Sequence, residues 1–157
     1  MRFQKENPMK KSLLYFMALV LALALAACAW TPDVEGESWV LEHVLVTDEA
    51  GEARVRYASE KFLAENAGKY ADAETVAFTL RAKDGKIEIK NVETGELFLG
   101  TYGEGDSANP EQTFFSLKFG KRTGSAVAEL YGNPETGEEE HLLTVSLAGY
   151  TMVFVAE

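Results

Sequence analysis

Hydrophobic residues follow two patterns in this chain of 157 residues: one continuous apolar run near the start, then short runs in which apolar and polar residues alternate. Alternation with a period of two is typical of β-strands that bury one face. One short helix is predicted from about Ser59 to Ala67, because Ser59 can cap it and Gly68 can end it. Strands are predicted at residues 39–47, 75–82, 86–92, 97–102, 113–119, 125–131, 141–147 and 150–155.

The strands after residue 75 are joined by connections of hairpin length, among which Asp84-Gly85 is a strong tight-turn signal. An open sheet of about eight strands would leave two long unpaired edges, and closing the sheet into a barrel removes them. The sequence therefore predicts a mainly β domain, an antiparallel up-and-down β-barrel of about eight strands with one short helix.

The inward positions of the predicted barrel are rich in large side chains. An eight-stranded barrel is just wide enough inside to hold such side chains or one small ligand. They line an apolar pocket or fill the barrel, and general burial tendencies favour the filled core. His43 shares the parity of Trp39 and Leu41, so we expect it to face inward, as a ligand contact or a hydrogen-bonded core residue. The candidate ligand-binding residues are His43, Phe78, Leu80, Phe115, Leu117, Met152 and Phe154.

The apolar run at the start of the chain has the features of a secretory signal peptide. Arg2, Lys5, Lys10 and Lys11 precede it, and residues 13–27 then form fifteen consecutive uncharged positions. A membrane-spanning helix usually needs about 20 apolar residues. A basic start followed by a shorter apolar core and small residues is instead typical of a signal peptide.

This run ends at Leu25-Ala26-Ala27-Cys28, and Cys28 is the only cysteine in the chain. The box resembles the lipobox of bacterial lipoproteins. The resemblance implies that the chain is cut before Cys28, that its thiol carries lipid, and that the protein is extracytoplasmic and anchored to a bacterial membrane, either plasma or outer. Several acyl chains make a stable anchor, because one chain alone binds a bilayer only marginally. The alternative is an ordinary signal peptide with a cysteine nearby by chance.

These boundaries divide the chain into a signal peptide at 1–27, a tether at 28–37 and a barrel domain at 38–157. Removal of the signal peptide takes away four basic residues and one acidic residue, which leaves 11 basic and 24 acidic residues and a formal charge of −13. Such a surface repels nucleic-acid phosphates and anionic lipid headgroups, so we expect no nucleic-acid partner.

The sequence offers little support for catalysis. A serine nucleophile needs a base, and the two histidines, His43 and His141, are far apart in the chain. No Gly-x-Ser-x-Gly stretch, phosphate-binding loop or closely spaced histidine pair is present. We therefore expect no enzymatic activity, no cofactor and no metal site.

The two ends of the predicted barrel carry a family resemblance. Gly36-Glu37-Ser38-Trp39-Val40-Leu41 opens the first strand, and Gly149-Tyr150-Thr151-Met152-Val153-Phe154 forms the last one. These motifs resemble those of bacterial lipoproteins with a lipocalin-like domain. The resemblance implies a barrel that closes between its first and last strands. It also implies that Trp39 plugs the closed end, as a core residue and not as a ligand contact.

Two functions are consistent with these features. The first, which we prefer, is a membrane-anchored envelope lipoprotein whose barrel binds a small hydrophobic or amphipathic ligand. The second is a filled barrel that serves as a structural or protein-interaction module of the cell envelope, acting through its acidic outer face. The sequence names neither the ligand nor a protein partner.

Overall fold

The computed structural model describes residues 32–105, 109–132, 134 and 137–157, so the predicted signal peptide and Cys28 lie outside the described residues. Within the described part, no helix is long and apolar enough to cross a membrane. The elements are β1 (Trp39–Thr47), β2 (Ala53–Ala58), α2 (Glu60–Glu65), β3 (Glu74–Thr75), β4 (Phe78–Lys83), β5 (Lys86–Asn91), β6 (Leu97–Glu104), β7 (Gln112–Phe119), β8 (Arg122–Gly132), β9 (Glu139–Leu147) and β10 (Tyr150–Ala156).

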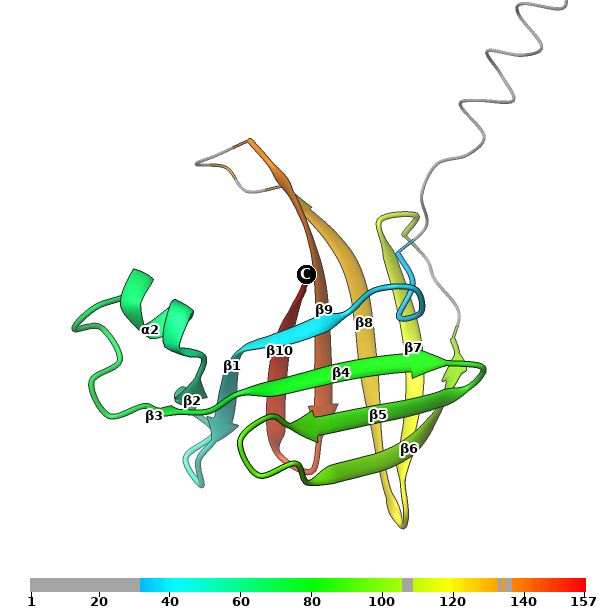
Figure 1. The fold of residues 1–157 in the computed structure, drawn as a ribbon, viewed down its shortest axis with the longest axis horizontal. Helices are drawn as coiled ribbons and strands as arrows, with labels where there is room; N and C mark the ends of the chain where they lie inside the picture. Colours follow the sequence, from blue (N-terminus) through cyan, green and yellow to red (C-terminus); the bar gives the residue numbers. More distant parts are fainter. Residues whose placement is uncertain (1–31, 106–108, 133, 135–136) are drawn as a thin grey trace, which may run out of the picture. The chain divides into compact units, whose positions relative to one another are not determined.

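Eight of these strands form a closed antiparallel barrel, which confirms the predicted fold class. The strands follow each other in the order β1, β4, β5, β6, β7, β8, β9 and β10, and β10 pairs back with β1. In Figure 1, β4 to β6 cross in front of β7 to β10. Every pairing in the barrel joins residues between 39 and 156, and residues 31–157 form one compact unit. We therefore expect a chain that begins at residue 29 to fold by itself.

Strand β1 divides its pairing between two neighbours on one of its edges. Trp39 and Val40 pair with β4, whereas residues 43–47 pair with β2. Strand β3 then adds to β2 in parallel, and α2 lies beside these strands outside the barrel (Figure 1). The sequence pattern did not predict β2 or β3. The helix itself was predicted, and the Ser59 side chain caps it by accepting a hydrogen bond of 3.2 Å from the Phe62 N–H.

A β-bulge in β1 corrects the expected orientation of His43. Leu41 lies opposite Phe154 of β10, yet His43 lies opposite the adjacent Val153, so β1 contains one extra residue at this point. After the bulge Val44 is the buried residue, at 5% exposure. The expectation that His43 faces inward is therefore wrong. Its ring instead stacks on Phe62 of α2, with the ring centroids 4.7 Å apart.

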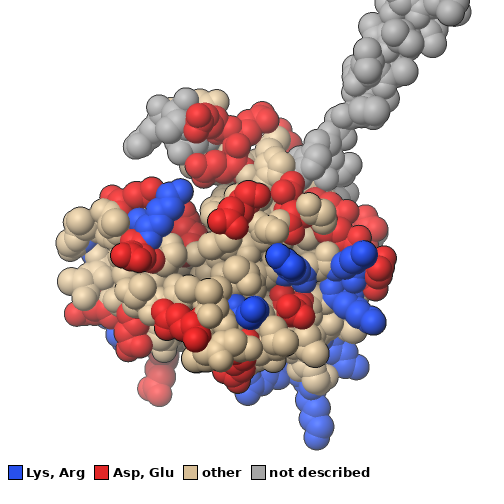
Figure 2. All heavy atoms as spheres, viewed as in Figure 1, with Lys and Arg blue, Asp and Glu red and all other residues tan. Residues whose placement is uncertain are grey.

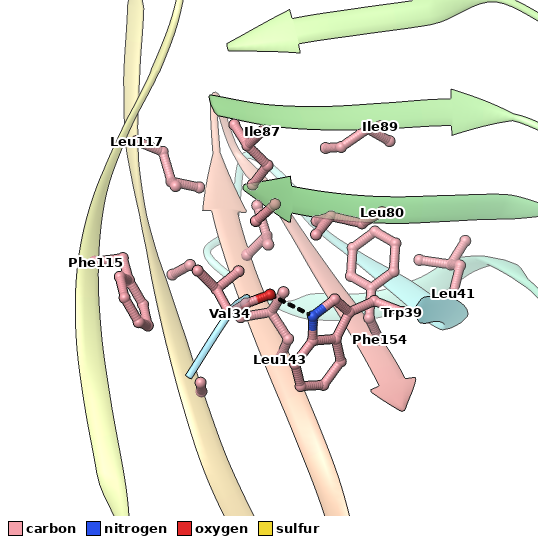
Figure 3. Packing of buried hydrophobic residues seen from close by; sticks show 14 of the residues in the cluster. Val34, Trp39, Leu41, Leu80, Ile87, Ile89, Phe115, Leu117, Leu143 and Phe154 are labelled. Carbon is pink, nitrogen blue, oxygen red and sulfur yellow. Dashed lines mark hydrogen bonds between the residues drawn. The ribbon is translucent and has the colours of Figure 1, made fainter. Parts of the chain in front are cut away.

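Most of the barrel core consists of side chains that alternation places inward, and Val34 and Val44 are added to them. Trp39, Leu80, Leu143 and Phe154 are each fully buried, as is Val34 just before β1. Figure 3 shows these residues converging from β1, β4, β9 and β10, with the Trp39 indole pointing towards Val34. Trp39 is thus a core residue, as the family resemblance implied.

Two hairpin turns use positive backbone angles. Asp84 and Gly85 have φ of 51° and 74°, and Ala148 and Gly149 have φ of 51° and 86°. Positive φ at both central residues defines the type I′ turn, which matches the twist of paired strands. The β7–β8 turn is formed by Gly120 and Lys121, and β8 begins before the strand predicted at 125–131, because Phe119 already pairs with Arg122.

We expect Gly124→Ala to destabilise the barrel. A Cβ at Gly124 would overlap with the carbonyl oxygen of Ser146 on the neighbouring β9. Overpacking of this kind typically costs about 1–3 kcal/mol. Gly132→Ala, on the same strand, is the matched control, because a Cβ there meets nothing within 4 Å. Urea unfolding of the chain from residue 29 measures both, and equal stability of the two variants would contradict the close approach of β8 and β9.

Candidate functional site

A pocket of about 780 Å³ opens at one end of the barrel. This is the end that carries the β5–β6, β7–β8 and β9–β10 connections. Ligand pockets typically enclose roughly 300–1,000 Å³ and are lined mainly by apolar side chains. The residues lining this pocket are Phe78, Ile89, Leu97, Phe98, Leu99, Phe119, Lys121, Arg122, Leu147, Ala148, Tyr150 and Met152.

The inner wall of the pocket is continuous with the barrel core. Phe78, Phe119 and Met152 line the pocket and also pack, half-buried, against the core cluster. At the rim, Leu97, Phe98, Leu99 and Tyr150 are each more than 40% exposed. Exposed apolar side chains that gather in one place typically mark a binding surface. The pocket is therefore an apolar hollow with a partly exposed apolar rim.

The structure separates the seven candidate ligand residues into three groups. Phe78 and Met152 line the pocket. Leu80, Phe115, Leu117 and Phe154 lie deeper, in the closely packed core, with exposures between 0 and 4%. His43 lies beside α2, with its Nδ1 3.1 Å from a carboxylate oxygen of Glu42.

Several pocket residues were not among the candidates. Phe119, Leu147 and Tyr150 share the inward parity of their strands, and this signal could have identified them. Leu97-Phe98-Leu99 is an unbroken apolar run, so alternation could not assign its faces. Lys121 and Arg122 carry no hydrophobic signal, and they fall in the connection between the strands predicted at 113–119 and 125–131.

The opposite end of the barrel is plugged by the segment before β1. Val34 is fully buried, and its carbonyl oxygen accepts a hydrogen bond of 2.9 Å from the Trp39 Nε1–H (Figure 3). The Tyr102 hydroxyl donates to a carboxylate oxygen of Glu35. Of the predicted tether at 28–37, the part from Pro32 onward is described, and in it Pro32 and Val34 are buried.

A second hollow, of about 790 Å³, lies between α2 and the ends of β9 and β10. Its floor includes Val40, Val155 and Phe62, and its walls are acidic. Within the described part of the chain, no group of three potential metal ligands is present. Besides Lys61 and His141, the charged lining residues are Glu37, Glu42, Glu65, Glu139, Glu140 and Glu157.

Comparison of the chain with protein-family models, curated proteins and solved structures gives no match. The fold and the site themselves define the class of molecule. It is an eight-stranded antiparallel β-barrel domain with one plugged end and an apolar pocket at the other.

We expect Trp39→Phe to destabilise the plugged end of the barrel. The change removes buried ring volume and leaves the Val34 carbonyl without its hydrogen-bond donor. The combined loss is about 2–4 kcal/mol in the free energy of unfolding. Urea unfolding measures it, with Tyr131→Phe as control because Tyr131 is an exposed aromatic residue. A Trp39→Phe variant as stable as the control would contradict the role of this hydrogen bond.

Proposed function

We propose that the barrel binds a small hydrophobic or amphipathic ligand in the pocket at its open end. The observation that carries this proposal is the pocket volume of about 780 Å³ among predominantly apolar side chains. A barrel filled along its whole length would leave no such space. A pocket of this size and lining is the usual place for a ligand in a small barrel.

The unequal filling of the barrel supports the same proposal. The plugged end supplies rigidity through Trp39 and the other fully buried side chains. The open end keeps Leu97, Phe98 and Leu99 between 44 and 66% exposed. These residues lose their contact with water only if something else covers them, and apolar burial stabilises a complex by about 25 cal/mol per Å² removed from water.

We further propose that the protein is a lipocalin-like lipoprotein of a bacterial envelope, anchored through lipid on Cys28. The support is the order of sequence features: a basic start, a fifteen-residue apolar run and Leu25-Ala26-Ala27-Cys28. In this arrangement the anchor would keep the barrel at the membrane surface. The ligand would reach the pocket by diffusion or from the membrane.

The alternative function is a protein-interaction module, and the acidic hollow beside α2 favours it. Six glutamates around an apolar floor are complementary in charge to a basic polypeptide segment. Two exposed aromatic residues, Phe114 and Tyr131, would then be further contact residues. This function would leave the apolar pocket without a role, which is why we rank it second.

The ligand proposal predicts that a neutral apolar fluorophore, 1-N-phenylnaphthylamine, binds to the chain from residue 29. Met152→Trp should weaken this binding about tenfold or more, since the larger ring occupies the pocket. Thr151→Trp is the matched control, because it adds the same ring to the adjacent position on the outer face of β10. Fluorescence titration measures both. Failure of the unaltered chain to bind the fluorophore, together with no small molecule in native mass spectra of protein from its host, would refute the proposal.

The anchor proposal predicts that Cys28→Ala abolishes the incorporation of labelled fatty acid into the full chain expressed in a bacterial host. The thiol is the only one in the chain, so no other cysteine can replace it. The variant should also leave the membrane fraction. Ala27→Gly is the control, because it keeps a small residue at the predicted cleavage site. Undiminished labelling of the Cys28→Ala chain would rule out lipidation at this residue.

A further inference from the structure

We propose that the ligand of the pocket carries an anionic group, a carboxylate or a phosphate, which Lys121 and Arg122 bind at the pocket mouth. This inference rests on the proposed function, because it assigns the chemistry of a ligand in the same pocket. The apolar walls would hold the ligand's hydrocarbon part, and the β7–β8 turn would hold its charged end.

The charged residues of the pocket lining have one sign. Among the described residues, Lys121 and Arg122 are the charged residues that line it, and no described carboxylate does. The chain as a whole has 25 acidic and only 15 basic residues. The local excess of positive charge in the pocket lining is therefore opposite in sign to the net charge of the chain. In Figure 2, Lys and Arg side chains gather on the lower and right parts of the visible face, whereas many Asp and Glu side chains lie towards the top.

Both cations are available to a ligand. Their side chains are exposed, and neither forms an ion pair with any described residue. Carboxylates do occur in neighbouring connections, at Asp48, Glu93 and Glu96, but none of them lines the pocket. The two positive charges therefore have no ion-pair partner at the mouth within the described part of the chain.

The β7–β8 turn fixes the place of these two residues. Gly120 has φ of 61°, and Phe119 pairs with Arg122 across a two-residue loop. Phe119 lines the pocket and packs against the core, and its pairing with Arg122 therefore holds the Arg122 backbone in place. The Arg122 guanidinium is a planar fork that matches the two oxygens of a carboxylate or phosphate, and Lys121 adds a second positive charge.

Amphipathic ligands with anionic, neutral and cationic head groups should therefore bind to the pocket with different affinities. An anionic head gains charge-assisted hydrogen bonds at the turn while its tail removes apolar surface from water. A neutral head gains only the second contribution. A cationic head is repelled by Lys121 and Arg122 at short range, where salt screens little, since the Debye length is about 8 Å at physiological ionic strength.

The test is competition against 1-N-phenylnaphthylamine with four amphiphiles that share a twelve-carbon tail: dodecanoate, dodecyl phosphate, dodecan-1-ol and dodecyltrimethylammonium. The chain from residue 29 is titrated below the critical micelle concentration of each ionic amphiphile and below the solubility limit of dodecan-1-ol. We expect the two anions to bind about three- to tenfold more tightly than the alcohol, as partly exposed charge pairs allow. The cation should bind most weakly. The ratio of the two anions tells a carboxylate preference from a phosphate preference.

The variant Lys121→Gln/Arg122→Gln should lower the affinity for the two anions to that for dodecan-1-ol and so abolish the preference for the anions. Lys83→Gln/Lys86→Gln is the matched control, because it removes the same charge from an exposed pair on the β4–β5 hairpin, away from this pocket. Equal binding of all four amphiphiles, or an anion preference that survives in the first variant, would overturn the inference while the proposed function stands. Failure of every amphiphile and of the fluorophore to bind would overturn the proposed function itself.

Discussion

The closure of the sheet by β1 is the constraint on which the rest of the structure depends. β1 pairs with β10 through seven residue pairs, but with β4 only through Trp39–Leu80 and Val40–Thr79. An unpaired edge would expose backbone donors and acceptors along a whole strand. Trp39 strengthens the short β1–β4 pairing, because its side chain also fills the core and donates a hydrogen bond to the Val34 carbonyl oxygen. One residue thus links the sheet, the core and the plug.

Closure at one end allows the other end to remain unfilled. The buried side chains around Trp39 stabilise the barrel. The aromatic side chains at the open end therefore do not have to pack against one another across the barrel interior. Gly100 contributes to this arrangement, because a Cβ there would lie 2.7 Å from the Phe119 ring. The ring lies against the β6 backbone, and it forms pocket wall at that position. The closely packed core and the apolar pocket therefore lie at different ends of one barrel.

Alternation predicted the barrel strands well because side chains on a strand have a strict period of two. The same rule misplaced His43, because a single extra residue in β1 exchanges the two faces and hydrophobicity gives no sign of it. Alternation also predicts which face of the strand a side chain lies on, but not how deep in the barrel the side chain is buried. Phe78 and Leu80 share a face, yet one lines the pocket and the other is fully buried. That difference depends on how neighbouring strands are staggered, which no single strand reveals.

The molecule as a whole is negatively charged, whereas the pocket mouth carries two positive charges. Which of them dominates depends on the distance between the ligand and the mouth. The whole chain carries a formal charge of −10, which slows the approach of any anion at low ionic strength. Within a Debye length of the mouth, the nearby Lys121 and Arg122 dominate instead, because more distant charges are screened. Anion selectivity would then arise from contacts in the bound state and would slow ligand release, with no help from long-range steering. On the proposed function, the acidic surface would repel polyanions such as nucleic acids, while the locally basic mouth would still admit a single small anion whose tail fits the pocket.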